Sequence, residues 1–108
     1  MPFLYDAFVR GSRGVMATPT SCGGAFFQCF YEAFLAGDTA LAKQRYNEII
    51  LLDNAIDNGF NNSAKYLVQL QGVKGMLPIN RGPNTLSSAR MRSLVSFHDW
   101  CVCAGLMK

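Results

Sequence analysis

Residues 11–42, GSRGVMATPTSCGGAFFQCFYEAFLAGDTALA, decide the fold that the sequence predicts. Residues 15–18 are a short apolar run between Gly14 and Pro19, which is typical of a strand covered on both faces. Phenylalanines then recur at helical spacing over residues 24–36. A single strand cannot satisfy its own backbone N–H and C=O groups, and the sequence offers no second convincing strand. We therefore expect the strand to pair with something outside this chain.

In and beyond this stretch, the sequence predicts helices separated by glycine residues. Gly37 predicts the end of the helix over residues 24–36, and Asp38 is the expected N-cap of the next helix. Ser87 or Ser88 is expected to cap the last helix, which carries an inward stripe to Val102. The other expected helices cover residues 2–10, 39–58 (ended by Gly59) and 63–72, where Ser63 is the expected cap.

The composition narrows the classes of protein to which the chain can belong. Half of the residues are hydrophobic and 16% are charged, whereas about 25% are charged in ordinary domains. A charged fraction this low is expected when much of the surface packs against another molecule or domain. The net charge of +3 comes from scattered basic residues, so we expect no nucleic acid as a partner. Membrane spans need about 18 apolar residues in a row, and none is present. Asp6 interrupts the first apolar stretch, so we expect no secretory signal and a cytoplasmic protein.

The cysteines and the lone histidine do not have the spacing of a chemical site. Cys22, Cys29, Cys101 and Cys103 contain no C-x-x-C pair, so we expect reduced thiols, no metal and no cofactor. A redox or metal-binding role remains a weaker hypothesis. His98 lies on an apolar helical face and is expected to pack in the core or at an interface.

Several short motifs occur in a fixed order along the chain. Two glycines precede the apolar run, an alanine and a Gly-Asp break follow the Phe-rich helix, and a lysine, a glycine and R-x-P come before the last helix. The positions are Gly11, Gly14, Val15, Met16, Ala17 and Thr18, then Ala33 or Ala36, Gly37, Asp38 and Ala42, then Lys65, Gly72, Arg81 and Pro83. In this order and spacing the chain resembles the C-terminal part of the N-acetylneuraminate lyase and dihydrodipicolinate synthase family.

The resemblance implies a fold class and a state of assembly. Members of the family are (β/α)8 barrels, so the expected class is α/β, with one strand at residues 15–18 and otherwise mostly helices. Residues 1–36 would hold the last barrel strand with its flanking helices, and residues 37–108 a helical extension of the same domain. The resemblance also implies a homo-oligomer.

The resemblance further implies an activity that this chain would lack by itself. The family binds pyruvate or another 2-keto acid as a Schiff base on a lysine, and a tyrosine moves protons. Both residues would precede Met1, so we expect no catalytic residue here and an inactive C-terminal fragment of an aldolase or lyase. By matching position, Met16, Ala17 and Thr18 would line the substrate pocket of the full-length parent. Lys65 does not match the Schiff-base lysine.

A second hypothesis is a small helical protein-interaction module without catalysis. Four or five amphipathic helices would then pack into a bundle that binds a partner. The apolar run at residues 15–18 distinguishes the enzyme fragment from the helical module, since an unpaired strand is expected in a fragment and is unfavourable in a helical bundle.

Overall fold

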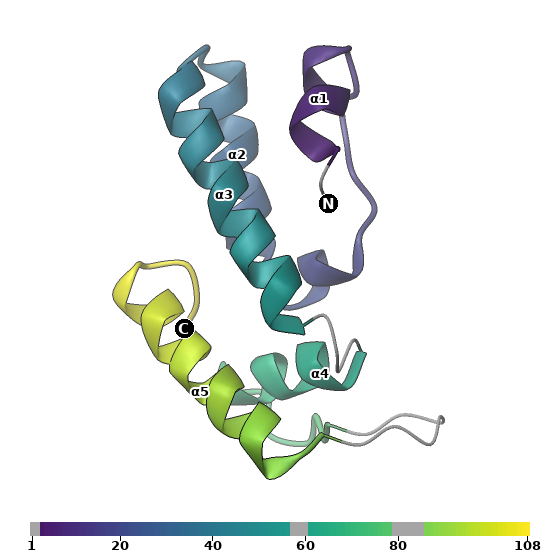
Figure 1. Cartoon of the computed structure of the whole chain (residues 1–108), viewed down its shortest axis with the longest axis vertical. Helices are drawn as coiled ribbons and strands as arrows, with labels where there is room; N and C mark the ends of the chain where they lie inside the picture. Colours follow the sequence, from purple (N-terminus) through teal and green to yellow (C-terminus); the bar gives the residue numbers. More distant parts are fainter. Residues whose placement is uncertain (1–2, 57–60, 79–85) are drawn as a thin grey trace.

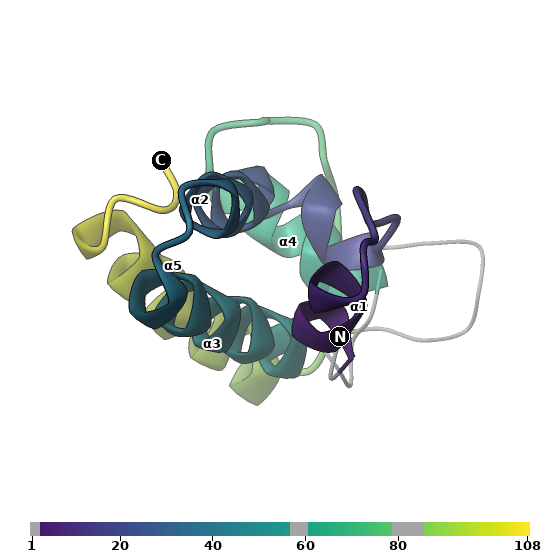
Figure 2. The same ribbon diagram turned by 90° about the horizontal axis from the view of Figure 1, so that it is seen from above.

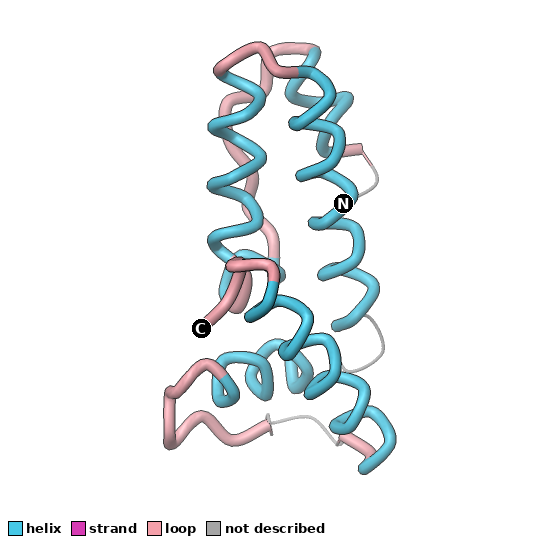
Figure 3. Tube along the Cα trace, turned by 90° about the vertical axis from the view of Figure 1, so that its left-hand side faces the viewer, coloured by secondary structure: helices cyan, strands magenta, loops and turns pink. Residues whose placement is uncertain are grey.

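The computed structural model describes residues 3–56, 61–78 and 86–108, and every regular element in these ranges is helical (Figures 1 and 3). Five α-helices and one short 3-10 helix, η1, follow one another along the chain. Their bounds are α1 Leu4–Val9, η1 Thr18–Ser21, α2 Gly24–Leu35, α3 Thr39–Ile56, α4 Asn61–Leu70 and α5 Ser88–Cys103. Gly59, Arg81 and Pro83, and the end of the second long helix expected at residue 58, lie outside the described residues.

The strand expected at residues 15–18 is not present, and the α/β class with a barrel strand is therefore wrong. Residues 12–17 have no regular structure, and η1 begins at Thr18 with Pro19 in its first turn. The backbone at Ala17 is extended, with φ −147° and ψ 145°. An extended segment becomes a strand only when a second backbone pairs with it, and no described segment does so. Proline also favours the first turn of a helix, which ends the extended stretch.

Helices α2 and α3 form a hairpin that is the longest feature of the molecule (Figure 1). Gly37 sits between them at φ +76°, in the left-handed region where glycine is favoured. The Asp38 carboxylate accepts a hydrogen bond from the Leu41 N–H at 3.1 Å, which is the geometry of an N-cap. The helix break that the sequence predicts at these residues is confirmed.

Helices α4 and α5 pack against each other at the end of the hairpin away from α1 (Figure 1). Ser87 Oγ accepts a hydrogen bond from the Arg90 N–H at 3.1 Å, which confirms one of the two expected caps. Ser63 is not a cap, because α4 begins earlier, at Asn61, and Ser63 is fully buried in its first turn.

Two side chains join the helical pairs. Gln71 Nε2, just after α4, donates to the Cys22 carbonyl at 2.8 Å and to the Leu67 carbonyl at 3.1 Å. The guanidinium of Arg90 donates to the carbonyl of Ala55 at 3.4 Å, which ties the start of α5 to the end of α3. These bonds connect the α4–α5 pair to the α2–α3 hairpin and the turn before it.

The core follows α3, which contacts every other described element. Seen from above, α3 lies between α1 and α5, with α2 beside it (Figure 2). The largest side chains that are almost completely buried come from four helices, which makes one continuous core. They are Phe26, Phe30, Ile49, Leu52, Ile56, Leu67 and Leu94.

Candidate binding groove

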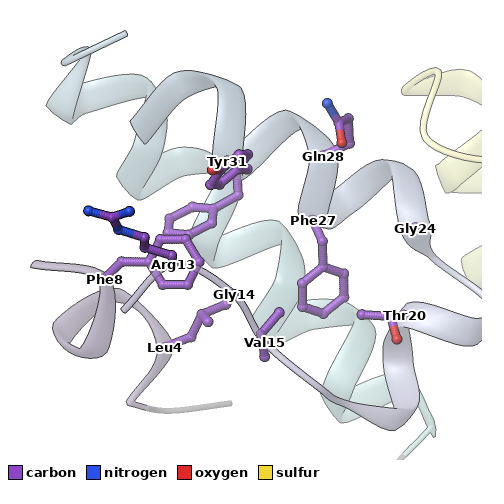
Figure 4. A pocket seen from close by; sticks show the side chains of 11 residues that line it. Leu4, Phe8, Arg13, Gly14, Val15, Thr20, Gly24, Phe27, Gln28 and Tyr31 are labelled. Atoms are coloured by element: carbon purple, nitrogen blue, oxygen red, sulfur yellow. The ribbon is translucent and has the colours of Figure 1, made fainter. Parts of the chain in front are cut away.

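A groove lies beside α2 in the described part of the chain (Figure 4). We call it the α1–α2 groove. It encloses about 380 Å³, within the range of small-ligand and peptide pockets. The lining residues come from α1, the segment after it, η1 and α2: Leu4, Phe8, Arg13, Gly14, Val15, Thr20, Gly24, Phe27, Gln28, Phe30 and Tyr31.

An aromatic cluster holds α1 in the position that forms one side of the groove. The Phe8 ring meets the Phe30 and Phe34 rings edge-on, with centroids 5.2 Å and 5.5 Å apart. Tyr5 lies 5.9 Å from Tyr46 on α3, measured between ring centroids. Edge-to-face pairs of this kind stabilise by about 0.5–1.5 kcal/mol beyond their buried area. A six-residue helix is marginal by itself, so this cluster is what fixes α1.

The other side of the groove is set by the close approach of the chain to α3 before α2 begins. A Cβ atom added at Gly23 would overlap Leu52 Cδ2, so a larger residue there would force the buried Leu52 side chain to shift. Gly24 adds no side chain and has open space around it. The Phe27 ring, which is mostly buried, faces Val15 across the recess (Figure 4).

The polar groups of the groove are few and mostly engaged. Gln28 Nε2 donates to Glu32 Oε1 at 2.9 Å, and the Thr20 hydroxyl donates to the Ala17 carbonyl. The guanidinium of Arg13 forms no ion pair with any residue that the structure describes. The groove therefore offers an apolar surface with one unpaired positive charge at its margin.

The segment beside the groove also carries backbone groups that lack protein partners. Within the described ranges, no hydrogen bond reaches the N–H groups of Arg13, Val15 or Met16. The side chain of Met16 is 99% exposed. Both features suit a surface that another molecule covers, because an exposed extended backbone can pair with a second one.

The structure separates the three predicted pocket residues. Met16 does not line the groove, Ala17 is half-buried at the start of η1, and Thr18 is described only through its backbone. The residues that the sequence reasoning missed are Phe8, Arg13 and Tyr31 among others. The sequence indicates these residues only weakly, through an aromatic helix at residues 2–10 that is soon followed by a second aromatic helix.

Two buried cysteines and the histidine have structural surroundings. Burial raises the pKa of Cys22 to about 11 and, together with the nearby Cys22, that of Cys101 to about 12. Both thiols stay protonated at neutral pH and are poor nucleophiles. The Nε2 atom of His98 hydrogen-bonds to the backbone oxygen of Lys108 at 2.7 Å, so His98 holds the C-terminal segment. No cluster of three metal-ligating side chains occurs in the part of the chain that is described.

A second recess of about 340 Å³ lies against α4. Lys65 lines it together with Ser21, Val68 and Met76, and the Lys65 side chain is half-buried. A half-buried lysine at the edge of a recess fits the expectation that Lys65 has a structural or surface role.

Comparison of the chain with protein-family models, with curated protein sequences and with solved structures finds no match. None of the helices in the described ranges combines the length and apolar character that crossing a membrane requires.

Proposed function

We propose that this chain is a helical protein-interaction module that binds its partner through the α1–α2 groove and performs no catalysis. The observation that carries the proposal is the groove itself, an apolar recess bordered by an extended segment with unpaired backbone groups. The described residues offer no activated nucleophile or metal cluster beside it. The all-helical core supports the module, which was the second of the two sequence hypotheses.

The exposed apolar side chains favour a protein as the partner over a small molecule. Met16, Val9 and Leu35 are each more than half exposed near the outer surface of α1 and α2. Exposed apolar surface that continues beyond a pocket is typical of protein interfaces. A small ligand would fill the recess and leave these side chains in water.

Site-specific photo-crosslinking tests the proposal. A benzophenone amino acid replaces Met16 in cells that make the chain, and the matched control carries it at Val73, which is half exposed in the turn after α4. We expect a light-dependent protein adduct from position 16 and little from position 73, identified by mass spectrometry. Equal labelling from both positions, or none from position 16, would contradict the proposal.

A second proposal keeps the family resemblance: the chain would be the C-terminal part of a pyruvate-dependent aldolase or lyase, inactive by itself. The support is local. Gly37 and Asp38 of the Gly-Asp break make the turn and the cap, and Ala42 is buried in the core. A homo-oligomer and a 2-keto acid substrate of the full-length parent belong to this proposal. A cytoplasmic location fits either proposal.

Borohydride trapping with pyruvate tests the chemistry of this chain. We expect no covalent adduct, since neither proposal places a Schiff-base lysine within residues 1–108. An adduct on Lys65 or Lys74 would contradict both. The second proposal also requires coding sequence upstream of Met1, in frame, with a strand-borne lysine. A stop codon there would rule out the second proposal and leave the protein-interaction module.

A further inference from the structure

We propose that the α1–α2 groove binds an extended protein segment in which an acidic residue lies between two apolar residues. The inference rests on the proposed function and names the chemistry of the partner. Three features carry it: a second apolar recess that continues the groove, an unpaired positive charge where the two recesses meet, and free backbone donors beside them.

A second recess, which we call the Leu35 recess, continues the groove along α2. It encloses about 410 Å³ and shares Phe8, Arg13 and Tyr31 with the groove. On α2, residues between 24 and 31 line the groove, and residues between 31 and 35 line the Leu35 recess. On the segment after α1, residues 13–15 line the groove and residues 11–13 line the Leu35 recess. Arg13 and Tyr31 therefore mark the boundary between the two recesses.

The charge at this boundary favours an acidic residue in the partner. Among the described residues, Arg13 is the only charged side chain that lines either recess, and it is exposed and unpaired. Tyr31 is 37% exposed and adds a hydroxyl group at the same place. A guanidinium donates paired hydrogen bonds to a carboxylate, and a partner that covers the recesses excludes water and strengthens this attraction. A basic residue at the boundary would instead place two like charges together.

The two recesses favour apolar residues on both sides of the acidic residue. The Phe27 ring lines the groove, and the Phe34 ring lines the Leu35 recess beside Leu35, which is 66% exposed. Apolar side chains that fill such recesses remove apolar surface from water on both partners. They are therefore expected to supply most of the affinity, while the acidic residue supplies the specificity.

The free backbone groups favour an extended partner over a helical one. The N–H groups of Arg13, Val15 and Met16 have no acceptor within the described ranges, and the backbone at Ala17 is extended. An extended segment alongside supplies carbonyl acceptors for these groups, whereas the carbonyl groups of a helix are already engaged. Alternate side chains of an extended segment point the same way. We therefore expect the acidic residue to have its apolar neighbours two positions before it and two positions after it.

Selection of a phage library of random peptides on the purified chain tests this preference. We expect the selected peptides to carry aspartate or glutamate at the centre of the apolar spacing described above. The Arg13→Glu variant is expected to select lysine or arginine at that position instead. Lys74→Glu is the matched control, because it changes the net charge equally at an exposed position in the turn after α4 and keeps the acidic preference.

Three results of the selection would overturn the proposal. The first is a set of peptides without a central acidic residue, and the second is apolar residues at the helical spacing of three and four positions. The third is the selection of no peptide at all by the natural chain.

Binding of one selected acidic peptide locates the site. By fluorescence anisotropy, Arg13→Glu is expected to raise the dissociation constant by at least about tenfold, and Lys74→Glu to leave it unchanged. The fold is expected to stay intact by circular dichroism, because Arg13 is exposed. In the natural chain, the peptide is expected to slow amide hydrogen exchange at residues 13–16. A folded Arg13→Glu chain that binds with the natural affinity, or unchanged exchange at residues 13–16, places the peptide elsewhere and overturns the proposal.

The two proposals fail in different ways. Selected peptides without an acidic preference, together with a protein adduct at position 16 in cells, overturn the acidic segment and leave the binding role intact. Absence of any adduct at position 16 removes the groove as a binding surface, and the acidic segment with it.

Discussion

At the scale of single residues, burial decides the chemistry of the cysteines. Cys22 lies between η1 and α2, and Cys101 lies on α5; both side chains are almost completely buried. The sequence shows only that four thiols are present at spacings unsuited to zinc. Which thiols are inert depends on the burial of Cys22 and Cys101 in one core. These residues are about 80 positions apart in sequence, and no local pattern encodes their burial.

Burial of these thiols makes the stability of the fold depend on alkaline pH. The pKa values are about 11 for Cys22 and about 12 for Cys101 in the folded chain, against 9.0 for an ordinary thiol. Well below pH 9 both thiols are protonated in the folded and in the unfolded chain, so they do not make the free energy of unfolding depend on pH. Above it the unfolded chain releases protons that the folded chain retains, so the free energy of unfolding falls as the pH rises toward 11.

Urea unfolding at pH 8 and near pH 11 measures this effect, because the first pH lies below the ordinary thiol pKa and the second lies above it. The Cys22→Ala/Cys101→Ala variant is expected to lose less stability between the two pH values than the natural chain. Cys103→Ala is the control, because Cys103 is exposed, and it keeps the full pH dependence. Identical pH dependence in all three proteins would show that the buried thiols do not cause it.

At the scale of elements, local signals predicted the helices well and failed at the extended segment. Glycine, the Asp38 and Ser87 caps and the apolar spacing located α2, α3 and α5 to within a few residues. Residues 15–18 have the composition of a buried strand, but a strand is defined by the backbone beside it. The groove was not predictable for a related reason, since it depends on how α1 docks on the hairpin.

The α2–α3 turn offers a direct test of capping. Asp38→Ala removes the acceptor for the Leu41 N–H, and we expect the free energy of unfolding to fall by about 1 kcal/mol. For a chain of this size the melting temperature falls by about 4–8 °C per kcal/mol. Asp38→Asn keeps an acceptor oxygen and is expected to lose much less. Equal losses in the two variants would mean that charge, and not the cap hydrogen bond, matters at this position.

At the scale of the whole molecule, the two helical pairs share one core and should unfold together. Leu94 on α5 is 1% exposed, and Leu→Ala at such sites costs about 2–5 kcal/mol. We expect Leu94→Ala to lower the stability of every helix. Trp100, packed on Phe97 with centroids 5.7 Å apart, reports on α5, and far-ultraviolet circular dichroism reports on all helices.

The two signals are expected to change at the same urea concentration in the natural chain and in Leu94→Ala. Val95→Ala is a milder control on the same helix, since Val95 is only half-buried. A first transition seen by Trp100 alone, with most of the helical signal retained, would show instead that α4 and α5 unfold as a separate unit from the α2–α3 hairpin.

The central position of α3 has a consequence for biosynthesis. Helices α1 and α2 leave the ribosome first, and their apolar faces are covered only once α3 has followed through Ile56. At about 5–20 residues per second, the 20 or so residues between Leu35 and Ile56 take about 1–4 s to make. During that interval the nascent chain displays the phenylalanines of α2 to solvent, and a chaperone that recognises aromatic segments would meet this protein at that stage.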